Sequence, residues 1–191
     1  LISRKEAKSR LEIDTSVLFT GGQGIAGLAV CKKTGTKVFY KIPIKTDYQT
    51  RHETRVMSAL MCIRDYLPHF CGFYTTVKIP LSDKARIAEP FDKGGKYLPK
   101  DVILMEYLSN SNTFTSQIDK MSKEQMDSAI TQTLFAMYIA NSVMGFTHND
   151  PHTDNMQVLS VSKDLVMLYR FARNGRVHHF LVPTNGIHTT I

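Results

Sequence analysis

The pattern of hydrophobic and polar positions predicts a β-rich first half. Five runs enriched in β-branched and aromatic residues predict strands at residues 17–20, 28–32, 37–42, 70–79 and 102–107. A helix is predicted over residues 50–63, because Val56, Leu60 and Ile63 recur at the spacing of one helix face. Residues 80–100 are rich in proline, glycine and charge, which is typical of a loop.

The second half has a different pattern, in which one long helix dominates. Ser122 followed by Gln125 predicts the start of this helix, and Gly145 predicts its end. The apolar face is predicted to contain Met126, Ile130, Leu134 and Met137. A hairpin is predicted from residues 165–171 and 177–182. The fold class is therefore α+β. The polar residues 109–112 mark the boundary between the strand-rich half and the mostly helical half.

Composition narrows the class of protein. The chain has 191 residues, of which 42% are hydrophobic and 21% charged, so it can bury a core. No apolar run is long enough to span a bilayer. Three cysteines without a C-x-x-C pair predict a reducing, intracellular compartment. The net charge is 24 − 17 = +7, but the basic residues are scattered, which argues against nucleic acid as the main partner.

A glycine motif lies between the first two predicted strands. Gly22, Gly24 and Gly27 form the pattern G-x-G-x-x-G. Glycines without a Cβ allow backbone N–H groups to approach phosphate oxygens closely. A dinucleotide-binding fold needs a helix directly after the glycines, whereas a second strand follows here. The order indicates a phosphate loop of the kinase kind, with an ordinary glycine-rich turn as the alternative.

A lysine and a glutamate follow at a suggestive spacing. Lys41 lies in the second predicted strand after the glycine motif, residues 37–42, and Glu53 is the glutamate of the next predicted helix. An ammonium group near the glycine loop would neutralise nucleotide phosphates, and a carboxylate would hold it in place. We therefore expect Lys41 and Glu53 to contact each other.

The polar loop behind the long helix carries the strongest signal. It reads His-Asn-Asp-Pro-His-Thr-Asp-Asn from His148 to Asn155. Asp150 is placed to accept a proton from an attacking hydroxyl, and Asn155 to bind magnesium five residues later. A rival interpretation takes His148 and His152 as a metal-binding pair on one helix turn. Pro151 argues against a continuous helix there.

Together these residues resemble the protein-kinase family over residues 18–159. His148, Asp150 and Asn155 match the pattern H-R-D-x-x-x-x-N, with His148 supporting the loop, and Lys41 matches V-A-x-K loosely. The resemblance implies a two-lobe fold. Residues 1–107 would be the N-lobe with its hinge (glycine loop, lysine strand and helix C in 11–78), and residues 108–191 a partial C-lobe.

The resemblance also assigns an adenine site, cofactors and a substrate. It implies that Met105 is the gatekeeper and that Glu106 and Tyr107 of the hinge face adenine. Ala29 occupies the position of the valine that usually covers adenine, and the adjacent Val30 is the residue expected to contact it. ATP and Mg²⁺ are the expected cofactors, and a protein Ser/Thr hydroxyl is the expected acceptor. The chain looks most like the divergent serine/threonine kinases of large DNA viruses, which implies the host cytoplasm or the virion.

Several departures from the family pattern keep alternatives open. Asn149 replaces the usual arginine, and His152 replaces a lysine, as in small-molecule kinases of the aminoglycoside or choline type. No D-F-G occurs, although residues 186–191 are predicted to be the strand that precedes it. A pseudokinase or structural module of a larger assembly is the other alternative. We expect a truncated kinase that needs its missing C-terminal part or an assembly partner for stability and activity.

Overall fold

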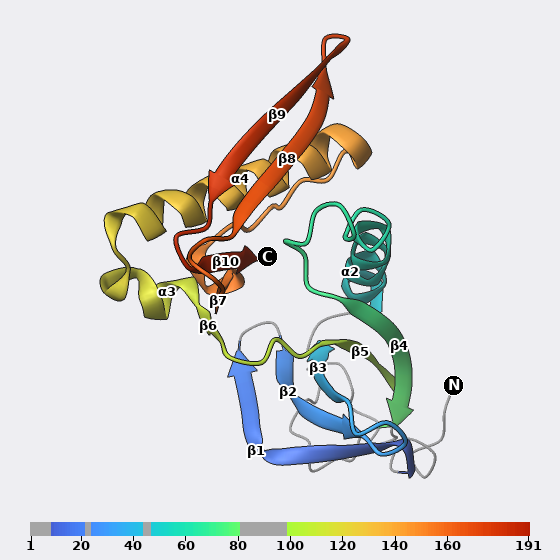
Figure 1. Ribbon diagram of the computed structural model, residues 1–191. Coiled ribbons are helices and arrows are strands. Elements are labelled where there is room, and N and C mark those ends of the chain that lie inside the picture. Colours follow the sequence, from blue (N-terminus) through green and yellow to red (C-terminus); the bar gives the residue numbers. More distant parts are fainter. Residues whose placement is uncertain (1–8, 22–23, 44–46, 81–98) are drawn as a thin grey trace. The chain divides into compact units, whose positions relative to one another are not determined.

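The structure is a computed structural model that describes residues 9–21, 24–43, 47–80 and 99–191 (Figure 1). The chain divides into two compact units. The first contains Leu1–Ala59 and Gly72–Tyr107, and the second contains Leu60–Cys71 and Leu108–Ile191. The boundary after Tyr107 lies where the sequence-based division placed it, whereas Leu60–Cys71 joins the second unit rather than the first.

The chain is α+β, and its described elements follow the predicted order. In the first unit they are β1 (Leu11–Gly21), β2 (Gly24–Cys31), β3 (Lys37–Pro43), α2 (Asp47–Leu60), β4 (Phe73–Pro80) and β5 (Pro99–Glu106). In the second they are β6 (Ser111–Thr113), α3 (Phe114–Gln117), η1 (Ile118–Lys120), α4 (Lys123–Met144), η2 (Thr153–Asn155), β7 (Gln157–Ser160), β8 (Val166–Arg173), β9 (Arg176–Pro183) and β10 (Ile187–Thr190). Within the described ranges, no helix has the length and apolar character needed to cross a membrane.

The first unit is built on a five-stranded antiparallel sheet in the order β1-β2-β3-β5-β4. The turn between β2 and β3 closes on the Cys31 carbonyl oxygen, which accepts hydrogen bonds from the N–H groups of Thr34 and Gly35. Gly35 has a φ of +70°, which a residue without a Cβ adopts at little cost. The core of this unit contains Ala29, Val38, Tyr40, Val102 and Leu104.

Helix α2 is shifted by three residues from its prediction. It spans Asp47–Leu60 rather than 50–63, and beyond it the N–H of Ile63 donates to the carbonyl oxygen of Leu60 in a tight turn. The predicted face is nevertheless the covered one, since Leu60 is buried. The hydroxyl groups of Thr54 and Thr76 lie 3.0 Å apart and join α2 to β4.

The long helix α4 begins and ends where the sequence predicted. At its start, the N–H of Gln125 donates to Oγ of Ser122 and the N–H of Ser122 donates to Oε1 of Gln125, which completes the capping box. At its end, Gly145 adopts a φ of +69° and donates its N–H to the carbonyl of Asn141. The left-handed C-cap explains why glycine occupies this position.

The apolar face predicted for α4 is only partly the buried face. Ile130 and Leu134 are 47% and 58% exposed. The positions that are buried instead are Ser128, Ala129, Gln132, Thr133, Ala136, Ile139 and Ala140. The helix packs through small residues and through polar side chains that bond to the backbone of the following strands. A prediction from apolar spacing therefore selects the wrong stripe.

Two small sheets accompany α4. The first has the order β10-β7-β6, and β6 begins inside the polar break predicted at residues 109–112. The side chains of Phe114, Ala129, Val158 and Ile187 form the core between this sheet and the helices. The strand predicted at the end of the chain is present as β10, which pairs with β7.

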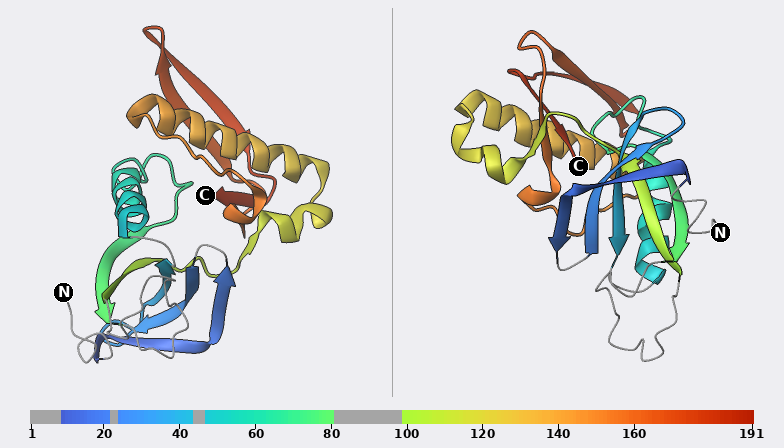
Figure 2. Two further views of the ribbon diagram at one scale, coloured as in Figure 1. Left: turned by 180° about the vertical axis from the view of Figure 1, so that it is seen from behind. Right: turned by 90° about the horizontal axis from the view of Figure 1, so that it is seen from below.

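The second small sheet is the predicted hairpin of β8 and β9. Its two-residue turn, Asn174 and Gly175, has φ values of 51° and 72°, as a type I′ turn requires. The hairpin lies along α4 in all three views (Figures 1 and 2). Ring centroids of Tyr169 and Phe180 lie 4.8 and 5.0 Å from that of Phe135 on α4. These aromatic contacts fix the hairpin on the helix.

Residues 60–71 belong to the second unit because His69 ties them to it. Its Nδ1–H donates to the carbonyl oxygen of Thr189 at 2.7 Å, and its Nε2 accepts from the hydroxyl of Tyr169 at 2.8 Å. The N–H of Ile191 also donates to the carbonyl oxygen of His69. The segment after α2 is therefore packed against the C-terminal strands.

Candidate functional site

The residues predicted to handle a nucleotide fall into two groups, one in each unit. The first unit contains Gly24, Gly27, Val30, Lys41, Glu53, Met105, Glu106 and Tyr107. The second unit contains His148, Asp150 and Asn155. Gly22 lies outside the described residues. Each group has its own local geometry.

In the first unit, Lys41 and Glu53 form the contact that the sequence predicted. Lys41 lies on β3, opposite Ala26 of β2 and Ile103 of β5. Its Nζ is 2.6 Å from Oε1 of Glu53 on α2. The two side chains are 27% and 35% exposed, so water still reaches the pair. A charge-assisted hydrogen bond of this length holds the ammonium group in a defined position beside β2.

The glycine segment joins two antiparallel strands. Gly21 at the end of β1 pairs with Gly24 at the start of β2, and Gly27 lies opposite Tyr40 of β3. Val30 lies further along the same strand. A strand after the glycines excludes a dinucleotide-binding turn, which needs a helix at this point. It is the arrangement that the phosphate-loop interpretation requires.

The predicted hinge residues lie at the end of β5. Met105 is in register with Phe39 of β3 and Phe73 of β4. The N–H of Glu106 donates to the carbonyl oxygen of Gly72, and its carboxylate accepts from the N–H of Gly72 at 3.0 Å. These bonds anchor the end of β5 to the start of β4. Contacts of Met105, Glu106 and Tyr107 with adenine remain a prediction.

In the second unit, the loop from His148 to Asn155 brings its two key side chains together. The amide Nδ2 of Asn155 donates to the backbone carbonyl oxygen of Asp150 at 2.9 Å and lies 3.4 Å from its Oδ2. The N–H of Asp150 donates to Nδ1 of His148 at 3.3 Å. The Asp150 side chain is 58% exposed. A reactant could therefore approach a carboxylate whose backbone is held by its neighbours.

His148 accepts a hydrogen bond within this loop. Burial lowers its pKa, against the opposing effect of the Asp150 carboxylate, which raises it. Its ring stands edge-on to Phe146 at a centroid distance of 6.1 Å. A neutral imidazole with Nδ1 as the acceptor suits the hydrogen bond from Asp150. The supporting role that the family resemblance implies for His148 stays a prediction.

His152 contacts Asp150, which the sequence analysis did not assign. Its Nε2 lies 3.4 Å from Oδ2 of Asp150, and its Nδ1 accepts from the N–H of Asp154. The spacing H-x-D-x-H was the signal that could have revealed this contact. The rival metal pair needs a helical turn at His148–His152, whereas this segment is not helical. No group of three or more His, Cys, Asp or Glu side chains in the described ranges could hold a metal.

The loop carries several oxygen atoms of the kind that hard cations bind. The amide nitrogen of Asn155 is engaged by Asp150, so its oxygen Oδ1 is the atom that suits a cation. Magnesium commonly takes one or two protein oxygens, with phosphate oxygens and waters completing its shell. The carboxylates of Asp150 and Asp154 are the other oxygen donors of the loop. Magnesium binding by Asn155 stays a prediction.

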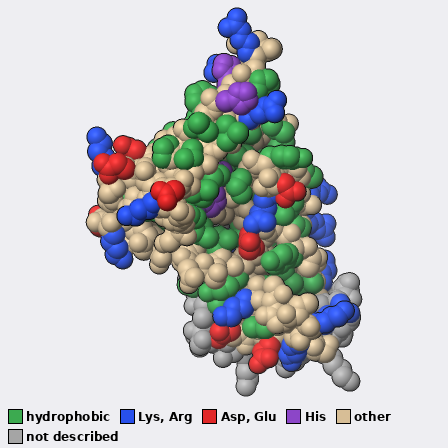
Figure 3. All heavy atoms as spheres, in the orientation of Figure 1, with side chains coloured by type: hydrophobic (Ala, Val, Ile, Leu, Met, Phe, Trp, Pro, Cys, Tyr) green, Lys and Arg blue, Asp and Glu red, His purple; other side chains and the backbone are tan. Residues whose placement is uncertain are grey.

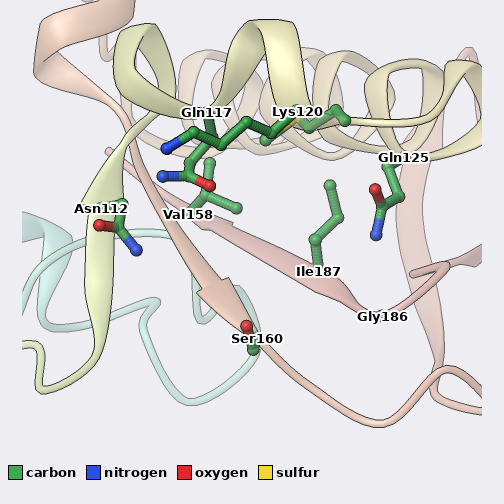
Figure 4. A pocket seen from close by; sticks show the side chains of 9 residues that line it. Asn112, Gln117, Lys120, Gln125, Val158, Ser160, Gly186 and Ile187 are labelled. Atoms are coloured by element: carbon green, nitrogen blue, oxygen red, sulfur yellow. The ribbon is translucent and has the colours of Figure 1, made fainter.

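A separate polar pocket lies in the second unit. Its volume is about 220 Å³, and it is lined by Asn112, Gln117, Lys120, Met121, Gln125, Val158, Ser160, Gly186 and Ile187. Figure 4 shows Gln117, Lys120 and Gln125 on the helical side, facing the strands that carry Val158 and Ile187. None of the predicted site residues lines this pocket. Its residues come from separated segments, so no motif could have predicted it.

Comparisons with known proteins give two distant relatives. No family model matches the chain. The chain is 28% identical over 160 residues to uncharacterized protein 038R of Invertebrate iridescent virus 3, covering 80% of this chain and 29% of that protein. It is 29% identical over 193 residues to uncharacterized protein 098R of Invertebrate iridescent virus 6, covering 81% of this chain and 32% of that protein. The chain thus spans less than a third of the length of the curated relatives that it matches, and both come from viruses.

Proposed function

We propose that the full-length protein has a two-lobe protein-kinase fold and transfers the γ-phosphoryl group of ATP to a Ser/Thr hydroxyl of a protein. The observation that carries this proposal is the 2.6 Å contact between Lys41 on β3 and Glu53 on α2. This pair follows a strand–glycine–strand hairpin, which is the order of elements that kinases use around ATP phosphates. The two viral relatives support a viral protein that acts in the infected cell or the virion.

Each residue has a defined role in the proposed reaction. Backbone N–H groups at Gly22, Gly24 and Gly27 would cover the phosphates, and Lys41 would hold the α- and β-phosphates. Val30, Met105, Glu106 and Tyr107 would surround adenine. When bound at Asn155, magnesium would neutralise charge on the β- and γ-phosphates.

Asp150 is the proposed base. Its carboxylate would accept the proton of the acceptor hydroxyl as that oxygen bonds to the γ-phosphorus. The bond from the γ-phosphorus to the bridging oxygen breaks in the same step, so ADP leaves with the bridging oxygen. His148 and Asn155 would hold the Asp150 backbone, and His152 lies close enough to influence the carboxylate.

The test is phosphoryl transfer by the full-length protein from labelled ATP with magnesium. Asp150→Asn should reduce the rate by a factor of about 10²–10⁴ while ATP still raises the melting temperature. Lys41→Ala should abolish both the activity and the ATP-dependent shift. Asp119→Asn, which changes an exposed carboxylate outside the loop, is the matched control and should retain both.

The acceptor and the nucleotide response separate this proposal from its alternatives. Transfer to a general Ser/Thr acceptor protein that depends on Asp150 supports it. Transfer only to small alcohols would replace it with a small-molecule phosphotransferase. If ATP produces neither transfer nor a thermal shift, the protein is a kinase-like structural module.

A further inference from the structure

The hairpin of β8 and β9 presents an outward face that nothing in the described chain covers. Side chains alternate across a strand, and Tyr169, Phe171 and Phe180 point toward α4, where they contact Phe135. The opposite positions form the outer face: Val166, Leu168, Arg170 and Ala172 on β8, with Val177, His179, Leu181 and Pro183 on β9. Because aromatic contacts hold the inner side of the hairpin against α4, the side chains of the outer face are presented on a fixed backbone.

The outer face is apolar near the base of the hairpin. Leu168 lies directly opposite Leu181, and these side chains are 58% and 70% exposed. Val166, opposite Pro183 at the base, is 47% exposed, and Val177, opposite Ala172 near the turn, is 51% exposed. Exposed apolar side chains gathered on one face are typical of a protein-interaction surface, whereas single exposed ones are common everywhere.

The same hairpin is cationic toward its turn. Arg170 lies opposite His179 on the outer face, and Arg173 lies opposite Arg176 at the turn, on the other face of the hairpin. The segment from Leu165 to Ile191 contains no aspartate or glutamate to neutralise them. Figure 3 shows Lys/Arg and His side chains at the end of the hairpin with hydrophobic side chains beside them, and no acidic group there on the visible face.

We propose that this cationic hairpin surface, the outer face together with the two arginines that flank the turn (Arg173 and Arg176), docks an acidic protein segment that extends past the turn and whose carboxylates adjoin apolar side chains. The two leucines would receive the apolar side chains, and the arginines would pair with the carboxylates in planar, bidentate geometry. Interfaces that combine an apolar centre with flanking arginines gain both affinity and orientation.

Two other anionic partners match this surface less well. A nucleic acid presents phosphates along its whole length, and it would leave Leu168 and Leu181 against charged backbone. A membrane-inserting hairpin would carry its apolar residues at the tip, whereas this turn is Arg-Asn-Gly-Arg and the leucines lie toward the base. The order of apolar base and cationic tip therefore favours a protein segment of mixed character.

The experiment measures binding of the full-length protein, without nucleotide, to a short fluorescent peptide that combines glutamates and leucines. Omitting ATP separates this inference from the proposed phosphoryl transfer. Changing Arg170, Arg173 and Arg176 to Glu should weaken binding at least about tenfold. Leu168→Ser with Leu181→Ser should also weaken it, and a peptide with glutamine in place of glutamate should bind poorly.

The matched control is Lys32→Glu with Lys33→Glu, which reverses exposed charges in the first unit and should leave binding unchanged. Circular dichroism melts establish that each variant is folded. The proposal is overturned if the hairpin variants bind the peptide as the wild type does, or if the control loses binding equally. It is also overturned if oligo-dT or phosphatidylserine vesicles bind through these residues while the peptide does not.

Discussion

At the scale of single residues, His69 makes a clear pH prediction. Burial, with a smaller effect of the nearby His188, lowers its pKa from the ordinary 6.5 to about 4, although the hydrogen bond to Thr189 opposes this. The unfolded chain therefore binds a proton that the folded chain excludes between these pH values. The stabilisation of the folded state by neutral His69 is complete above pH 6.5 and is lost as the pH falls toward 4. The loss amounts to about 3 kcal/mol of unfolding free energy.

Urea denaturation at several pH values between 7 and 4 checks this expectation. His69→Gln should be less stable at pH 7 but should lose less of its remaining stability on acidification. Exposed His179 provides the control, since His179→Gln should keep the wild-type pH dependence. Parallel stability curves for the wild type and His69→Gln would contradict the prediction.

Local motifs in the sequence selected the residues of the candidate site, whereas contacts between distant segments could not be predicted from the sequence. Lys41 with Glu53 and Asp150 with Asn155 are twelve and five residues apart, and the required chemistry restricts their spacing. His69 meets Tyr169 and Thr189 at separations of 100 and 120 residues. The residues next to His69 in the sequence do not indicate that its side chain is buried against segments so distant in the chain.

At the scale of elements, Gln132 connects α4 to the end of the chain. Its side chain is fully buried; Nε2 donates to the carbonyl oxygen of Ile187 at 3.0 Å, and Oε1 accepts from the N–H of Thr189 at 3.1 Å. Gln132→Leu would leave these two backbone groups unsatisfied in the interior. We expect a loss of about 2–4 kcal/mol in unfolding free energy, measured by chemical denaturation.

An exposed helix position provides the comparison for this prediction. Ser122→Ala removes the α4 cap and should cost only about 1 kcal/mol. A Gln132→Leu variant as stable as Ser122→Ala would show that the connection to β10 contributes little.

The same helix shows how far patterns predict elements. Caps and turn residues predicted both ends of α4 and the Asn174-Gly175 turn, because those residues act on their own backbone. The spacing of Ile130 and Leu134 did not identify the covered face. Apolar periodicity shows which residues share one face of a helix. Whether that face is buried depends on the elements that pack against it, and here β10 packs against the polar residues Gln132 and Thr133.

At the scale of the whole molecule, the proposed chemistry is divided between two units. Lys41 and Glu53 lie in one, and Asp150 and Asn155 lie in the other. The nucleotide would be held mainly by the first group and the acceptor hydroxyl by the second. This division explains why Lys41→Ala and Asp150→Asn are expected to differ in ATP binding although both remove activity.

The second unit also exposes an apolar stripe on α4. Ile130, Leu134 and Tyr138 follow one another at four-residue spacing and are 47%, 58% and 37% exposed. Because such a stripe is costly to hydrate, residues 1–191 prepared as a separate polypeptide should self-associate and bind a hydrophobic dye. Light scattering after size exclusion measures the association.

Two variants decide whether the stripe is the cause. Ile130→Glu with Leu134→Lys places an ion pair on the stripe and should raise the monomer fraction severalfold, with helix content preserved. Lys123→Glu with Asp127→Lys exchanges exposed charges on the same helix and should leave association unchanged. A monomeric wild-type polypeptide, or equal effects of the two variants, would show that the α4 stripe does not drive association.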